Sequence, residues 1–170
     1  ETLAGYLTPA AGRCLIHGEQ YTASQLHALL AYLPHDFDVF NLSLAQNLRL
    51  GSAQATDEQL WQALESVSLA TWAKQQPLQL DTPLGEHAVA VSGGQARRIA
   101  LARLLLQHKP LMLLDEPFAG LDEATAAKVA KALVEHQKNG ILLLVSHDLP
   151  APLTELKQQI GLQLTPSSAV

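Results

Sequence analysis

The sequence has few of the features that secreted, membrane-spanning or nucleic-acid-binding chains share. Cys14 is its only cysteine, so no internal disulfide can form, and a reducing, cytoplasmic setting is the simplest interpretation. No apolar run approaches the roughly 18 residues that a membrane-spanning helix needs. With a net charge of −5, the chain also lacks the basic field that attracts nucleic acid, and we expect no nucleic-acid partner.

A natural beginning is missing as well. The sequence has no initiator Met and no leader with a basic region and a cleavage pattern, and residues 1–7 have the pattern of a helix. We therefore expect Glu1 to be a cut within a longer polypeptide. The composition suits a folded protein, since 48% of the 170 residues are hydrophobic and 16% are charged. That is enough apolar material for the core of one domain or two small lobes.

The order of the apolar segments predicts an α/β fold. Continuous apolar runs at 111–114 and 141–145 are typical of strands that are buried on both faces. A third strand is expected at 31–33, after a helix at 24–30, and Pro34 stops it. Because helices connect these strands, the sheet should be parallel and covered by helices.

Capping residues predict where three helices begin. These residues are Thr56 with Gln59 and Ser92 with Gln95, both spaced as capping boxes, and Asp122. The three helices should run to about residues 67, 106 and 137, and Gly140 is expected to close the last one. The helical middle, residues 36–107, then forms a second lobe inserted into an α/β core made of residues 1–35 and 108–170.

Two carboxylates, Asp115 and Glu116, stand where the apolar run at 111–114 ends. Ligands of open α/β sheets bind beyond the carboxyl ends of the strands. Asp115 could hold a magnesium ion through water, because Mg²⁺ prefers carboxylate, phosphate and water ligands. Glu116 could polarise an attacking water. The alternative is a solvated acidic turn before Pro117.

Two further segments could contribute to a site. Residues 92–95, Ser-Gly-Gly-Gln, open a helix, and their glycines let backbone N–H groups approach an anion with the support of the helix dipole. The alternative is a capped helix after a flexible turn. His147 follows the apolar run at 141–145 and should lie on the same rim as Asp115, although a lone His is usually structural.

In this order and spacing, these segments resemble the ATP-binding cassette family over nearly the whole chain. The resemblance implies a P-loop NTPase (RecA-like) parallel-sheet core with an inserted α-helical subdomain, and it implies ATP and Mg²⁺ as ligands. For the ATP of its own cassette, the resemblance implies that Asp115 is the Walker B aspartate that holds Mg²⁺ through water, that Glu116 is the catalytic base, and that His147 is the switch histidine at the γ-phosphate. It implies that the signature motif, which contacts the ATP held by the opposite cassette, consists of Ser92, Gly93, Gly94 and Gln95. It also implies that Asp122 belongs to the D-loop, which crosses the dimer interface.

Two more segments resemble exporter-type cassettes. Residues 81–86 contain the pattern Thr-x-x-Gly-Glu, which touches the membrane domain in such cassettes, and residues 40–44 with Asn47 resemble the segment after the Q-loop. The resemblance implies an exporter with a transmembrane domain as partner, at the cytoplasmic face of the inner (plasma) membrane. The Phe-x-x-Ser-Leu pattern is similar to that of the two-subunit thiol (cysteine or glutathione) exporters of cytochrome bd assembly.

The chain departs from that family at three places. It contains no Gly-x-x-x-x-Gly-Lys-Ser/Thr loop, the Walker A grip on ATP phosphates that the family places before the helix at residue 1. After Pro34, His35 stands where the family has the Q-loop Gln; it could donate to a water or to the magnesium shell, or it could weaken coupling to the membrane domain. After His147 the family usually has another hairpin, whereas here Pro150 and Pro152 lead into a short helix and a polar tail.

We therefore expect the ATP-hydrolysing module of an exporter, working as a homo- or heterodimer with a second cassette and inactive without its N-terminal part. The alternative is a non-catalytic cassette that offers only its signature face to an active partner, which His35 favours and Glu116 with His147 disfavours. A soluble cassette in translation or DNA repair is a third possibility, against which the segment at 81–86 argues. The exported substrate stays open, because its path lies in the membrane part.

Overall fold

The computed structural model describes residues 4–5, 15–16, 19–85 and 90–154 of the chain. The helix expected at 1–7 lies outside them except for residues 4 and 5. The strands of the described part are β1 (Leu15–Ile16), β2 (Glu19–Gln20), β3 (Leu30–Leu33), β4 (Leu111–Asp115) and β5 (Ile141–Val145). Its helices are α1 (Ala23–Leu29), α2 (Leu44–Arg49), α3 (Asp57–Ser66), α4 (Ala70–Gln75), the 3-10 helix η1 (Gln79–Asp81), α5 (Gly93–Leu105), α6 (Glu123–His136) and α7 (Ala151–Thr154).

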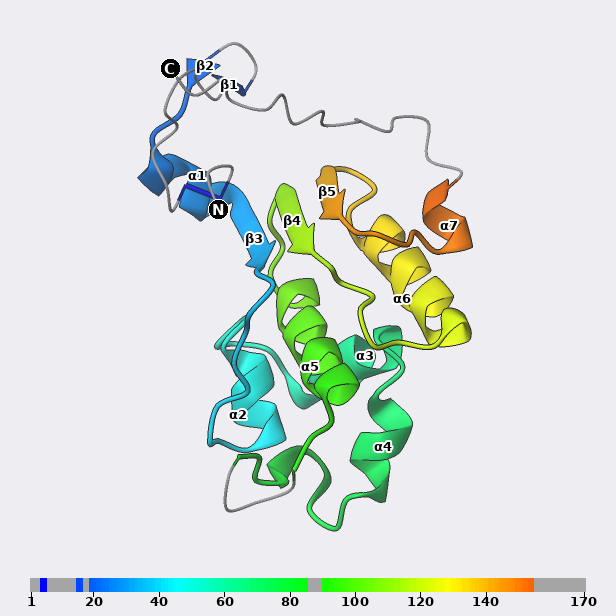
Figure 1. Cartoon of the computed structure of the whole chain (residues 1–170). Helices are drawn as coiled ribbons and strands as arrows, with labels where there is room; N and C mark the ends of the chain where they lie inside the picture. The colour runs from blue at the N-terminus through cyan, green and yellow to red at the C-terminus, as the bar shows by residue number, and fades with distance from the viewer. Residues whose placement is uncertain (1–3, 6–14, 17–18, 86–89, 155–170) are drawn as a thin grey trace, which may run out of the picture.

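Strands β3, β4 and β5 form one parallel sheet in that order, so the predicted parallel α/β arrangement is confirmed. In the register of the sheet, Leu33 lies beside Leu114 and Asp115 lies beside Val145. All three carboxyl ends point downward in Figure 1, toward the helical part of the molecule. Strands β1 and β2 pair antiparallel in a separate two-stranded sheet.

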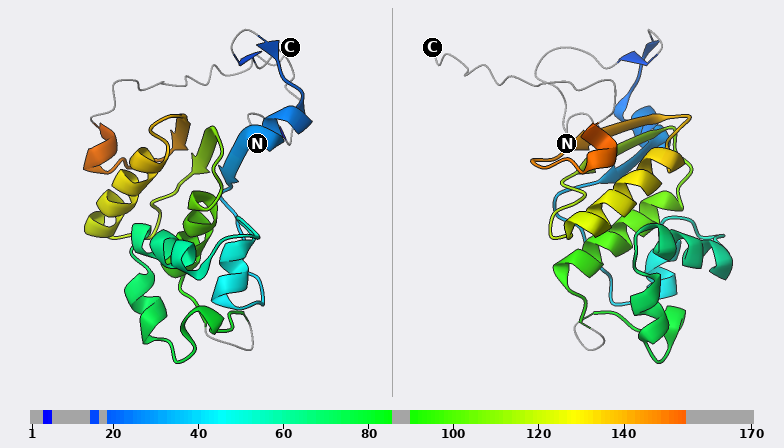
Figure 2. Two further views of the ribbon diagram at one scale, coloured as in Figure 1. Left: turned by 180° about the vertical axis from the view of Figure 1, so that it is seen from behind. Right: turned by 90° about the vertical axis from the view of Figure 1, so that its right-hand side faces the viewer.

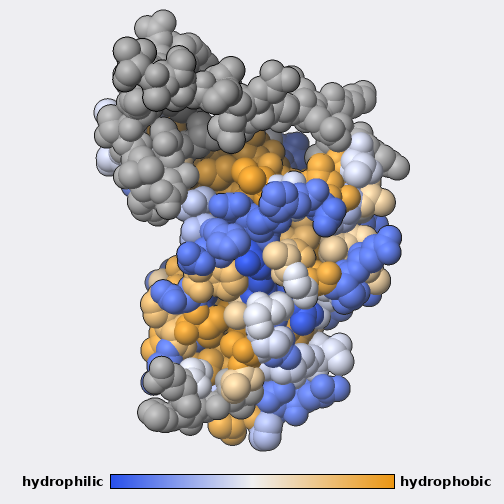
Figure 3. All heavy atoms as spheres, in the orientation of Figure 1, coloured by the Kyte–Doolittle hydropathy of each residue, from blue (hydrophilic) through white to orange (hydrophobic). Residues whose placement is uncertain are grey.

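The prediction that both long apolar runs are fully buried strands is right for β4 and wrong for β5. The inner residues of β4, from Met112 to Leu114, are all buried. In β5, Ile141 and Val145 are each 54% exposed, and the residues between them are only half-buried. Edge position alone does not explain this, because β3 is the other edge strand of the described sheet and is largely buried. Helices α1 and α5 contact β3, whereas the main contact of β5 among the described elements is β4. Figure 3 shows the resulting hydrophobic surface around the strands, in the upper part of the view.

The helical starts follow the capping residues as predicted. Thr56 accepts a hydrogen bond from the backbone N–H of Gln59, whose side chain bonds back to the Thr56 N–H, and Ser92 does the same with Gln95. Asp122 caps α6 through the N–H of Thr125. Such caps satisfy backbone donors that have no partner within the helix.

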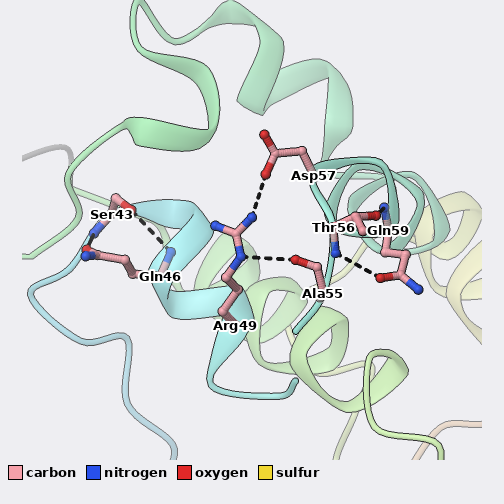
Figure 4. Close-up of polar contacts among 7 residues, drawn as sticks. All are labelled: Ser43, Gln46, Arg49, Ala55, Thr56, Asp57 and Gln59. Atoms are coloured by element: carbon pink, nitrogen blue, oxygen red, sulfur yellow. Dashed lines mark hydrogen bonds and ion pairs between the residues drawn. The ribbon is translucent and has the colours of Figure 1, made fainter. Parts of the chain in front are cut away.

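Two further capping boxes, at Thr22 with Gln25 and at Ser43 with Gln46, were not singled out from the sequence. They open α1 and α2 in the same way. Figure 4 shows the Ser43 box beside that of Thr56. Helix α1 ends at Leu29, so Leu30, expected in the helix, is the first residue of β3 instead.

One hydrophobic core runs through the helices and the sheet. Its largest fully buried side chains are Leu33, Leu44, Leu48, Leu60, Leu64, Leu69, Leu84, Ile99, Leu101, Met112, Leu114 and Leu133. Helix α5 contributes on nearly every side, because it contacts α2, α3 and β3. It runs from the helical end of the molecule up to the start of β4 (Figures 1 and 2), so its N-terminus and the strand ends belong to one packed unit.

Gly140 does not close α6 as predicted. The helix ends at His136, and Gly140 follows three residues after the C-cap Gln137 without a positive φ. A side chain at this position would meet the Pro110 carbonyl oxygen at 2.5 Å and the Gln137 Nε2 atom at 2.3 Å. Gln137 Nε2 in turn donates to the carbonyls of Lys109 and Ile141. The glycine therefore permits the close approach of the turn to the starts of β4 and β5.

Candidate nucleotide site

The carboxyl ends of the three parallel strands place the predicted strand-end residues at one edge of the sheet. Asp115 is the last residue of β4 and is half-buried, and Ser146 with His147 directly follows β5. His35 lies two residues beyond β3, and its side chain is exposed. Parallel strands bring such residues together because their ends share one side of the sheet.

Glu116 is held in an unusual backbone conformation. Its φ is 47°, in the left-handed region that non-glycine residues seldom adopt. Its N–H donates to the Val145 carbonyl oxygen at 2.7 Å and so extends the ladder between β4 and β5 by one bond. This turn directs the carboxylate toward the segment that follows β5.

The Glu116 carboxylate accepts hydrogen bonds from that segment. Its Oε1 accepts the backbone N–H of His147 at 3.0 Å. Its Oε2 lies 3.3 Å from the Ser146 hydroxyl, whose single hydrogen can instead be donated to the nearer Asp148 carbonyl oxygen, at 2.8 Å. The side chain of Glu116 is only 17% exposed. The carboxylate thus has a fixed backbone donor and a defined direction, as a positioned general base requires.

The His147 imidazole lies beside the same carboxylate but faces solvent. Its Nε2 is 3.6 Å from Glu116 Oε1, and its side chain is 94% exposed. A contact between side chains this exposed contributes little to stability. The His147 ring therefore lies at the edge of the candidate site, and the stability of the fold depends little on it.

A pocket of about 420 Å³ opens next to Glu116. Residues from three places line it: the turn at 118–121, the start of α6, and the segment from Ser146 to Ala151. Glu116 and Ser146 are among its polar lining groups. The pocket has room for a water or a phosphate-sized group next to the carboxylate.

The Ser-Gly-Gly-Gln segment opens α5, as its sequence predicted. Ser92 is the N-cap, and both Ser92 and Gly93 are exposed. A side chain at Gly93 would meet nothing within 4 Å, whereas one at Gly94 would lie 3.0 Å from the Gly120 carbonyl oxygen. The helix N-terminus is thus open on one side and packed against the turn before α6 on the other.

Asp122 has a clear local task as the N-cap of α6. It accepts the Thr125 N–H at 2.9 Å and the Thr125 hydroxyl at 2.7 Å. These hydrogen bonds from Thr125 lower the pKa of the Asp122 carboxyl. Its carboxylate therefore stays ionised at the start of the helix, where the dipole favours negative charge.

The structure adds residues that sequence reasoning missed, foremost the arginines of α5. Arg97 donates to the Glu116 carbonyl oxygen at 2.6 Å. Arg103 donates to the carbonyls of Asp38 and Asn47 and to the Asn47 side chain, and its guanidinium lies over the Phe40 ring. The signal in the sequence was the basic pair and the later Arg in a helix whose other positions are largely apolar and small.

The two segments that resembled exporters lie side by side. Ser43 and Pro83 form an isolated antiparallel bridge, and Leu44 N–H donates to the Thr82 carbonyl oxygen at 2.9 Å. The buried Asn47 holds the same loop by bonding the backbone of Phe40 on both its N–H and its carbonyl. Glu86 lies outside the described residues. Together the segments form one surface, on which Phe40 and Leu42 are exposed.

Among the described residues, no three His, Cys, Asp or Glu side chains lie together in a group that could hold a metal ion, and His35 with Asp36 is no exception. No helix of the described part has the length and apolar character to cross a membrane.

A family model described as ABC transporter matches residues 1–119. The chain therefore belongs to the ABC transporter family, as the resemblance of its motifs implied.

Similar proteins include the glutathione/L-cysteine transport system ATP-binding/permease protein CydD of Bacillus subtilis, 33% identical over 86% of this chain and 26% of that protein. The CydC protein of the corresponding system in Haemophilus influenzae is 35% identical over 76% of the chain and 23% of that protein. A solved structure of a bacterial Atm1-family ABC exporter with ATP bound superimposes with a TM-score of 0.79 at 27% identity, over 85% of this chain and 26% of that one. The chain thus spans about a quarter of the length of the relatives it matches.

Proposed function

We propose that this chain is the ATP-binding and hydrolysing part of an ABC exporter, with Glu116 as the general base. The observation that supports this most is the Glu116 carboxylate, held by Ser146 and His147 at the strand ends beside a pocket. The carboxylate accepts the proton of an attacking water, and the exposed His147 ring meets the γ-phosphate. Family membership and the exporter-like segments at 40–44 and 81–85 support the same assignment.

The residues present fit a magnesium ion through one carboxylate. Asp115 supplies a half-buried oxygen ligand at the end of β4, of the kind that Mg²⁺ prefers together with water and phosphate oxygens. When bound, the ion would neutralise charge on the ATP phosphates. In the proposal Asp115 holds it through water, while Glu116 acts on the attacking water.

The proposed partners follow from the same arrangement. A second cassette, identical or different, would place its ATP against the open N-terminus of α5, where Ser92, Gly93, Gly94 and Gln95 offer N–H groups and a favourable dipole. Asp122 would belong to the loop between the cassettes. Residues 36–107 would form the helical subdomain inserted in the core of 1–35 and 108–170, and it would dock on a transmembrane domain at the cytoplasmic face of the inner membrane. The named cargos of the relatives differ, so the proposal specifies export without a substrate class.

One observation favours the alternative of a non-catalytic cassette. His35 occupies the Q-loop position and is exposed, whereas an imidazole has different hydrogen-bonding geometry from the expected amide. In that case the chain would present its α5 N-terminus to an active partner without hydrolysing ATP itself.

The test is MgATP hydrolysis by the full-length protein with Glu116→Gln. The amide cannot accept the proton, so turnover should fall at least about a hundredfold while ATP binding is kept. Glu135→Gln is the matched control, because Glu135 is an exposed carboxylate paired with Lys138 at the surface, and its turnover should match the wild type. Undiminished turnover in Glu116→Gln would refute the role of Glu116. A wild type that binds ATP without hydrolysing it would favour the non-catalytic alternative.

A further inference from the structure

Arg97 joins three segments that lie far apart in the sequence. It sits in the second turn of α5, two residues after the Ser-Gly-Gly-Gln segment, and is half-buried. Its Nη1 donates to the Glu116 carbonyl oxygen at 2.6 Å and lies 3.5 Å from that of Asp115. Its guanidinium lies over the ring of Phe37, in the segment after β3, at 4.9 Å from the ring centroid.

The residue that Arg97 holds has an unfavourable backbone and is one of three non-glycine residues with a positive φ in the described part of the chain. A left-handed φ in a non-glycine residue persists only where surrounding contacts over-determine it. Three hydrogen bonds hold the backbone of Glu116: its N–H donates to the Val145 carbonyl oxygen, and its own carbonyl accepts from Arg97 and, at 3.2 Å, from the N–H of Ala119. The charged donor is the shorter of the two bonds to that carbonyl, and charge-assisted bonds are the stronger kind.

The neighbouring Arg98 does not reach Glu116. It donates to the carbonyls of Gly94 and Ser68, both in the helical part of the molecule, and Ser68 is another residue with a left-handed φ, of 55°. The planar guanidinium of Arg97 is partly buried and lies over the Phe37 ring. These contacts fix the direction of the side chain toward the end of β4. The Arg97 side chain therefore reaches from α5, the helix that begins with the Ser-Gly-Gly-Gln segment, to the backbone of Glu116.

We propose that Arg97 is a positioning residue, which fixes the backbone of Glu116 and links it to the helix that carries the signature motif. This inference rests on the proposed function. In that function, the α5 N-terminus binds the ATP of the second cassette, whereas Glu116 acts on the ATP of its own. A shift of α5 on ATP contact is then passed to the backbone of Glu116 through the Arg97 side chain, so Arg97 connects the two ATP sites.

The test uses full-length protein with Arg97→Gln and Arg97→Lys. The glutamine keeps a donor but is shorter and uncharged, and turnover should fall about tenfold with the ATP KM within about twofold, since the carboxylate is misplaced while ATP binding is not. The lysine keeps the positive charge but has no planar guanidinium, so its turnover should lie between that of Arg97→Gln and that of the wild type. Arg49→Gln is the control, because Arg49 bonds Ala55 and the exposed Asp57 within the helical part (Figure 4), and it should leave turnover unchanged.

A second readout does not depend on hydrolysis. Amide hydrogen exchange of residues 116–121 in the nucleotide-free protein should become faster in Arg97→Gln, while exchange of the inner turns of α5 stays as in the wild type. A wild-type turnover and unchanged exchange in Arg97→Gln would overturn the proposal, as would a rise in KM at constant turnover. Loss of protection throughout α5 would also overturn it, because Arg97 would then stabilise the helix alone. If Glu116→Gln keeps full turnover, the proposed function fails, whatever Arg97 does.

Discussion

The helical part and the sheet of this chain differ in how fully they bury their apolar side chains. From α2 to α5, several helix starts have their own capping box and each of the longer helices buries a stripe of leucines, with Leu48, Leu60 and Leu101 fully buried. In the sheet, β4 is buried, but Ile141 and Val145 of β5 are exposed by more than half. A helix satisfies its backbone hydrogen bonds within itself, whereas a strand needs a neighbour on each side. The comparison teaches that the helical part buries its leucines in a core that it shares with β3 and β4, whereas β5 leaves apolar side chains exposed in the described part of the chain.

The largest expected effect contrasts a leucine from each part. Leu64→Ala empties a fully buried position of α3 and should lower the free energy of unfolding by about 3 kcal/mol. Leu144→Ala, at a half-buried position of β5, should cost about 1 kcal/mol, because less surface is already removed from water. Chemical denaturation followed by circular dichroism measures both. Equal losses would contradict the difference between the two parts.

A smaller effect tests the caps of the helical part. Thr56→Ala removes the acceptor for the Gln59 N–H and leaves the first turn of α3 uncapped, so the free energy of unfolding should fall by about 1 kcal/mol. Thr71→Ala is the control, since Thr71 is an exposed residue inside α4, and it should be neutral or slightly stabilising. The fluorescence of Trp61 and Trp72, both in the helical part, reports the unfolding transition. A Thr56→Ala midpoint equal to that of Thr71→Ala would show that the cap is dispensable.

The smallest effect concerns the junction of the two parts at low pH. His136 of α6 stacks on His108, with ring centroids 5.6 Å apart, and burial followed by the nearby His108 lowers the pKa of His136. The folded state therefore prefers the neutral ring. Its contribution is fully present above the unfolded pKa of about 6.5 and is lost as the pH falls through the lower folded pKa. Thermal melts at pH 7.5 and 5 should show a smaller acid-induced loss in His136→Gln than in the wild type; an equal loss would assign it to other groups.

Local patterns were enough to predict the elements that position the site. The capping boxes at Thr56 and Ser92 and the cap at Asp122 marked helix starts correctly, since a cap involves residues only three apart. The apolar run of β4 was also interpreted correctly. The same reasoning failed for β5, because an apolar run does not reveal which other elements will cover the faces of the strand. It failed for Gly140 because that glycine avoids a clash with Pro110, which lies 30 residues earlier in the chain.

The residues of the candidate site could be singled out by type and place in the sequence, whereas their contacts could not be predicted. Asp115, Glu116 and His147 were singled out from their places after apolar runs, and the structure brings Glu116 and His147 together. The left-handed backbone of Glu116 and its carbonyl bond to Arg97 had no counterpart in the sequence pattern. Both depend on the way that α5 packs against the strand end.

The sequence by itself determined where the helices begin, that the central strand is buried, and which family the motifs belong to. These properties depend on residues a few positions apart, whose hydrogen bonds and apolar periodicity act locally. Only the tertiary structure decided that the Glu116 carboxylate meets Ser146 and His147, that Arg97 reaches the backbone of Glu116, and that β5 is half-exposed. Those outcomes depend on packing between segments 19 to 31 residues apart and on which strands become neighbours, and no local pattern contains that information.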